Sequence, residues 1–131
     1  MQDHRKLRVW QRAQEICVEV YQFSAGFPFE ERFGLTAQVR KASVSVGANI
    51  AEGSRRISNS DKGRIINIAE SEAAEAMSEL DIALRLKYGR TGEAERLIDA
   101  YDRWLGMTET LRQMVVGEQG GREPSTVNRL P

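Results

Sequence analysis

The chain has 131 residues, of which 40% are hydrophobic and 29% charged, and its 19 basic residues equal its 19 acidic ones. This length fits one domain with a compact core, and the balanced charge excludes a uniformly basic nucleic-acid binder. The single Cys17 excludes an internal disulfide and a cysteine zinc site, and the single His4 excludes schemes that need two imidazoles. No apolar run approaches the ~20 residues that span a bilayer, and no signal-peptide core follows Met1, so a cytoplasmic protein with no membrane partner is expected.

Apolar residues recur three and four positions apart along most of the chain, which is the helical period. The pattern predicts a first helix over residues 9–21, ended by Pro28, and a second over 35–53. A third helix is predicted over residues 60–87 and a fourth over 93–115. No stretch alternates with a period of two, so no sheet is expected.

Four amphipathic helices joined by short connections predict an all-α fold, an antiparallel up-down four-helix bundle. The bundle is expected to occupy residues 1–116. Residues 117–131 are rich in glycine and proline and have no hydrophobic period, so they are predicted to form a flexible C-terminal tail.

Four polar residues, Arg40, Asn49, Glu52 and Glu75, border the predicted inner faces of the second and third helices. A carboxylate inside a bundle costs several kcal/mol unless an arginine or an amide donates to it. The sequence therefore predicts that these four residues form a hydrogen-bonded structural layer that fixes the helix register.

Catalytic chemistry finds little support in the residue pattern. The spacing of Glu72, Glu75 and Glu79 suits a di-iron bundle, but such a site also requires Glu-x-x-His pairs, which this chain lacks. Neither Ser43 nor Ser45 belongs to a recognisable nucleophile motif with a neighbouring base, and no phosphate-binding loop is present. No catalytic residue, metal or cofactor is predicted.

The neutral total charge hides an asymmetry, because the chain up to residue 64 contains 11 basic and 7 acidic residues. Ordinary solvated helix faces would explain this distribution, and so would a basic patch that faces a polyanion such as RNA. The residues that would form the patch are Arg5, Lys6, Arg8, Arg12, Arg55, Arg56, Lys62 and Arg64.

The third predicted helix has the opposite bias, since residues 65–84 contain five acidic residues and no basic one. An alternative function is therefore a protein–protein adaptor with no nucleic-acid role. It would recruit a basic partner through the acidic surface at Glu70, Glu72 and Glu79, or through the tail.

Three segments of the chain are distinctive: Val9-Trp10-Gln11-Arg12-Ala13, Glu31-Arg32-Phe33-Gly34-Leu35-Thr36, and Asn49-Ile50-Ala51-Glu52-Gly53 followed by Arg56. With these segments the chain resembles the 23S rRNA intervening-sequence protein family of bacteria, also known simply as four-helix bundle proteins. The resemblance covers roughly residues 7 to 116 and departs from the family pattern at Ser71 and Glu72.

The resemblance implies an up-down bundle that assembles as a ring-shaped homopentamer. A related branch, the accessory protein of diversity-generating retroelements, binds nucleic acid and a reverse transcriptase, whereas the function of the family is largely unassigned. The resulting expectation is a non-enzymatic oligomer that contacts RNA or a nucleic-acid-bound protein through its basic rim.

Overall fold

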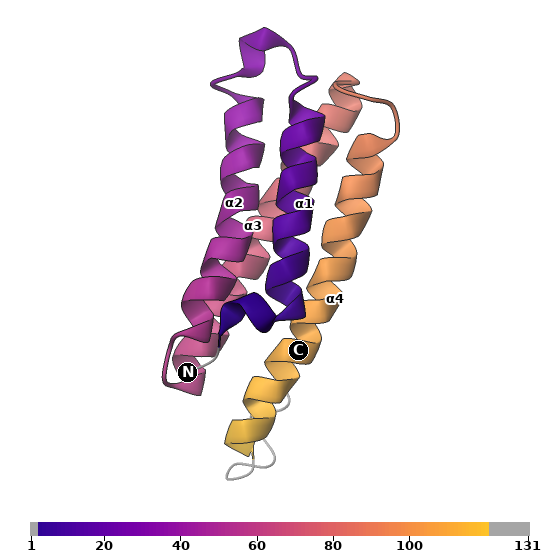
Figure 1. The fold of residues 1–131 in the computed structure, drawn as a ribbon. Helices are drawn as coiled ribbons and strands as arrows, with labels where there is room; N and C mark the ends of the chain where they lie inside the picture. Colours follow the sequence, from indigo (N-terminus) through magenta and orange to yellow (C-terminus); the bar gives the residue numbers. More distant parts are fainter. Residues whose placement is uncertain (1–2, 121–131) are drawn as a thin grey trace.

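The computed structural model describes residues 3–120, with side chains through residue 114, and contains no strand within that range. Four long helices make up the molecule (Figure 1): α1 (Arg8–Ser24), α2 (Leu35–Ser54), α3 (Asn59–Leu86) and α4 (Glu93–Gly120). Two short 3-10 helices, η1 (His4–Lys6) and η2 (Phe29–Glu31), precede α1 and α2. The predicted all-α class and the four helices are confirmed.

The helices run up, down, up and down. Helix α1 packs against α2 and α4, and α3 closes the bundle by packing against the same two helices. This order places η1, the start of α1 and the α2–α3 connection at the same end of the bundle (Figure 1). The η2 segment and the α3–α4 connection lie at the opposite end.

Capping interactions set the limits of α3. The helix begins one residue before the predicted Ser60, because the Ser58 hydroxyl accepts a hydrogen bond from the Asp61 backbone N–H at 3.1 Å. It ends at Leu86, where Lys87 adopts the left-handed conformation with φ of 60°. The Tyr88 N–H then donates to the Ala83 carbonyl, which satisfies one of the free carbonyls in the last turn.

Helix α4 continues to Gly120, four residues beyond the predicted end of the bundle at residue 116. A glycine such as Gly117 weakens a helix by about 1 kcal/mol but does not prevent helical backbone angles, so the loss of apolar period did not mark the helix end. The remainder of the predicted tail, residues 121–131, lies outside the described residues.

The core consists of apolar side chains from all four helices, including Ile16, Val39, Leu80, Leu97 and Trp104, which are fully or almost fully buried. Four of the eight buried residues of α3 are alanines, which let the neighbouring helices approach closely. The indole N–H of Trp104 donates to the Val9 carbonyl at 2.8 Å and so ties α4 to the first turn of α1.

A buried hydrogen bond crosses the centre of the bundle between α2 and α4, which occupy diagonal positions. The hydroxyls of Ser43 and Tyr101 lie 2.5 Å apart, and both side chains are almost completely buried. Burial raises the pKa of Tyr101 well above its usual range, so this contact is a neutral hydrogen bond at physiological pH.

Candidate nucleic-acid interface

The topology brings the two basic segments of the sequence to the same end of the molecule. The η1 segment contacts α2 as well as α1, so residues near position 5 lie at the end of the bundle where α2 finishes and α3 begins. We call this surface the basic end. It comprises Arg5, Lys6, Arg8, Arg55, Arg56, Lys62 and Arg64.

The first half of the basic end is held by local contacts. Asp3 caps η1 by accepting from the Arg5 backbone N–H at 3.0 Å, and it also accepts from the Arg5 guanidinium. The hydrogen bond from the Arg5 side chain, followed by the one from its backbone, lowers the pKa of Asp3 to about 2. Arg8 donates to the Gln11 side chain at 3.0 Å, while Lys6 is exposed.

The second half of the basic end surrounds the α2–α3 connection. Arg56 forms an ion pair with Glu52, and the Arg64 Nε lies 3.9 Å from an Asp61 carboxylate oxygen. Exposed ion pairs of this kind contribute about 0–1 kcal/mol, so a phosphate can compete for these arginines. By sequence, segments 3–8 and 52–64 together contain seven basic residues and three acidic ones, a difference of four.

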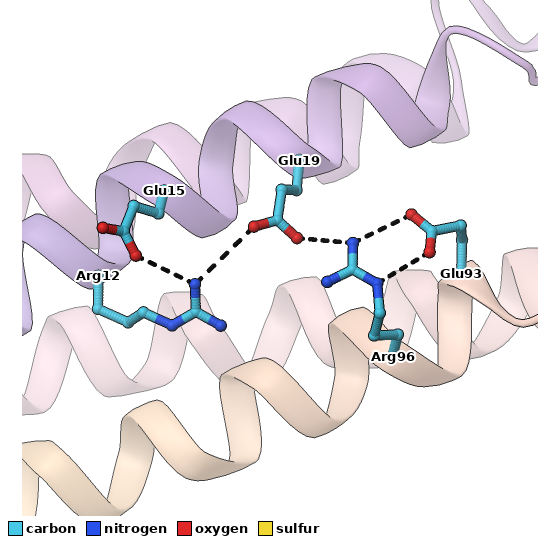
Figure 2. A network of polar contacts seen from close by, with 5 residues as sticks. All are labelled: Arg12, Glu15, Glu19, Glu93 and Arg96. Atoms are coloured by element: carbon cyan, nitrogen blue, oxygen red, sulfur yellow. Dashed lines mark hydrogen bonds and ion pairs between the residues drawn. The ribbon is translucent and has the colours of Figure 1, made fainter.

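Arg12, which the sequence grouped with the basic patch, belongs instead to a chain of ion pairs between α1 and α4 (Figure 2). Its Nη1 lies 3.2 Å from Glu15 and 3.8 Å from Glu19. Glu19 in turn lies 2.6 Å from Arg96, which also contacts Glu93 at 2.8 Å. Because the charge of Arg12 is neutralised by two carboxylates within the chain, Arg12 is not part of the candidate interface.

The predicted polar layer is not brought together. Arg40 points toward α1, where it donates to the Ser24 hydroxyl at 2.7 Å and to the Tyr21 carbonyl at 3.1 Å. Asn49 donates to the Ser45 carbonyl of its own helix at 2.9 Å. Neither donor reaches a carboxylate.

The two carboxylates of that predicted layer, Glu52 and Glu75, are both exposed, and Glu52 pairs with Arg56. The physical reason is helical phase, because Gly53 and Ala76, one position further along, occupy the buried face. The polar contact that spans the core is the hydrogen bond between Ser43 and Tyr101, neither of which the sequence assigned to the layer.

Comparison with known proteins assigns the chain to a protein family. The family model for the 23S rRNA-intervening sequence protein matches residues 5–110. The chain belongs to this family. The matched range includes every residue of the basic end and the whole ion-pair chain of Figure 2.

A solved structure supports the same fold for this family member. It is a protein of unknown function from the S23 ribosomal protein family of Bacteroides thetaiotaomicron VPI-5482, and it is 22% identical to this chain with a TM-score of 0.65. The alignment covers 83% of this chain and 95% of that one. No curated protein matches the sequence.

In this family member, two of the three α3 carboxylates expected to recruit a partner are not free on the surface. Glu70 accepts from the Thr108 hydroxyl at 2.6 Å and pairs with Arg112 of α4. Glu79 is only 7% exposed, and burial, with the nearby charge of Glu75, raises its pKa to about 7. Of the three carboxylates expected to recruit a basic partner, only Glu72 is partly exposed and without an ion pair or burial within the described residues. The geometry therefore does not favour the adaptor function.

Among the described side chains, residues 3–114, no group of three histidine, cysteine, aspartate or glutamate residues is arranged to hold a metal ion. None of the helices within residues 3–120 is long and apolar enough to cross a membrane.

Proposed function

We propose that this protein is a non-enzymatic RNA-binding protein that contacts RNA, free or within a ribonucleoprotein, through its basic end. The observation that carries this proposal is the convergence of two basic segments, about 50 residues apart in sequence, on one end of the bundle. Segments 3–8 and 52–64 hold seven basic and three acidic residues in a chain whose total charge is zero, which favours a positive field at that end.

The chemistry of the basic end suits the phosphate backbone rather than the bases. Its side chains are arginines and lysines on short or terminal helical segments, and both types bind phosphate oxygens. Affinity should therefore depend strongly on salt and weakly on sequence, because each neutralised phosphate releases counterions.

Assembly into a ring-shaped homopentamer, as the family resemblance implies, is part of the same proposal. A closed ring repeats one basic end per subunit by symmetry. Weak phosphate contacts at each subunit would then add through multivalency on a single RNA molecule.

The direct test is binding of a structured RNA across a salt series, with two triple variants that change the net charge equally. Arg8, Arg55 and Arg64 are replaced by glutamate in the first variant, and the exposed Arg32, Arg85 and Arg90, at or near the opposite end, in the control. We expect the logarithm of the binding constant of the wild type to fall by about 0.7 to 0.9 per neutralised phosphate for each tenfold increase in salt.

The first variant should bind more weakly at every salt concentration and show a shallower slope, whereas the control should retain most of the affinity. The proposal is wrong if the wild type fails to bind at low salt, or if the two variants lose affinity equally.

A further inference from the structure

The outer face of α2 has few charges for a helix on a protein surface. A helix that borders solvent normally carries charged residues opposite its apolar face. The exposed positions in the middle of α2 are instead Ala37, Gln38, Lys41, Val44 and Ala48, with one charge among them. This composition is typical of a helix that is covered on both faces.

The neighbouring helices extend this apolar surface. On α1, Val18 and Tyr21 are exposed, and Val18 lies in register with Val44 of α2. That register follows from two flanking contacts: Arg40 lies over the Tyr21 ring, and Gln14 covers Gly47.

Helix α3 carries a stripe of its own beside its core-facing residues. Spacings of four and three residues place the members of this stripe on one face of the helix, as in a coiled-coil seam. Its ends are exposed apolar side chains and its centre is acidic. In chain order the stripe is Ile68, Glu72, Glu75, Glu79, Ile82 and Leu86.

Helix α4 differs from the other three. Among its described side chains up to residue 114, Met114 is the one large apolar group that is exposed. Its outer face carries exposed ion pairs such as that between Arg103 and Asp99. Within the four long helices, the exposed apolar side chains are therefore concentrated on α1, α2 and α3, while Phe29, Phe33 and Ile57 are exposed in the connections.

Among residues 3–114, whose side chains are described, the charges on this surface form no ion pairs. Lys41 has no carboxylate partner there, and no basic side chain in that range pairs with Glu72, Glu75 or Glu79. One oxygen of Glu79 is buried with no hydrogen-bond partner in the same range. The exposed cation Lys41 on the face of α2 and the acidic centre on the stripe of α3 are thus complementary.

We propose that the outer face of α2 is the surface on which a second copy of this chain docks, and that the copy presents its α3 stripe with Glu75 facing Lys41. In this register the apolar ends of the stripe lie about 10 Å or more along the helix from Glu75, so Ile68 or Ile82 comes level with Ala48, and Val44 borders the acidic centre. Used once per pair of copies, with α2 of one copy against α3 of the next, the contact is head-to-tail, and its repetition gives a ring where the rotation between copies closes. This inference rests on the proposed assembly and is independent of RNA binding.

Sedimentation equilibrium of the full chain tests the surface with a matched pair of substitutions. Val44→Asp places a charge on the α2 face, whereas Met114→Asp places one at a similarly exposed apolar position on α4. We expect the wild type and Met114→Asp to sediment as the same oligomer, and Val44→Asp to sediment as a folded chain of 14.8 kDa. A monomeric wild type, or an oligomer that persists in Val44→Asp, would overturn the proposal.

Charge exchange tests the pairing itself. Lys41→Glu and Glu75→Lys should each weaken association at least tenfold, and the double variant, which restores opposite charges across the contact, should recover most of it. No recovery in the double variant would disprove the pairing. RNA titration of the same proteins separates the proposals: failure of RNA binding with an intact, Val44-dependent oligomer refutes only the function of the basic end.

Discussion

The hydrogen bond between Ser43 and Tyr101 offers a sharp test of the bundle's interior, through the variants Ser43→Ala, Tyr101→Phe and the double variant. Ser43→Ala leaves the Tyr101 hydroxyl without a partner at a site that is 0% exposed. A buried donor or acceptor that loses its partner costs about 1–3 kcal/mol, so the free energy of unfolding should fall by that amount.

Tyr101→Phe should cost less, about 1 kcal/mol, because the Ser43 hydroxyl can turn back to a carbonyl of its own helix. In the double variant both polar groups are absent, and the loss should be smaller than the sum of the single losses by about 1–2 kcal/mol. That difference is the coupling energy of the α2–α4 contact.

Urea unfolding followed by tryptophan fluorescence and by circular dichroism, at one fixed protein concentration, gives the four free energies. The denaturant slope should be unchanged across the set, since no variant alters the apolar surface greatly. A coupling energy below about 0.5 kcal/mol would refute the view that this hydrogen bond fixes the register of α2 and α4.

Three further substitutions probe other parts of the structure. Gly89→Ala should lower the free energy of unfolding by at least about 2 kcal/mol, because Gly89 has φ of +74° and a Cβ there collides with the Phe23 ring. Gly92→Ala is the control, since Gly92 has φ of +88° but open space around it, and it should cost only about 1 kcal/mol. Equal losses of the two variants in urea unfolding would contradict this reasoning. Folded Glu79 holds its proton more tightly than unfolded Glu79, so stability should fall by about 1–2 kcal/mol as pH rises from about 5 to about 8. Glu79→Gln should remove that fall, and a variant with the wild-type pH profile would show that another group titrates. Arg96→Ala breaks contacts to Glu19 of α1 and Glu93 of α4, whereas Arg103→Ala breaks an exposed pair within α4. The free energy of unfolding should fall by about 1 kcal/mol more for Arg96→Ala than for Arg103→Ala. Equal effects in the same assay would argue against the network of Figure 2.

The sequence predicted the helices because their signal is distributed over many residues. In α1 alone, Val9, Ala13, Ile16 and Val20 repeat the apolar period and are all buried, so an error at one position does not change the prediction. The basic end was also within reach, because an up-down bundle places the start of its first helix and the junction of its second and third helices at the same end.

The prediction of a polar layer was wrong because the exposure of each polar residue depends on rotation about its helix axis. One residue corresponds to about 100° of rotation, which separates exposed Glu52 from buried Gly53. Hydrogen-bond and ion-pair partners that lie far apart in the sequence could not be predicted either. Nothing local to Glu19 indicates that it meets Arg96, and the sequence signal at Ser43 was only that of a small residue.

Acetylation of the four lysines of the chain, followed residue by residue with mass spectrometry in the presence and absence of RNA, tests the central claim most directly. Lys6 and Lys62 lie at the basic end, Lys87 follows α3 at the opposite end, and Lys41 lies on α2. Bound RNA should slow the acetylation of Lys6 and Lys62 several-fold and leave Lys87 unchanged. Protection of Lys87 with free reaction of Lys6 and Lys62 would contradict the assignment of the basic end as the RNA-binding surface.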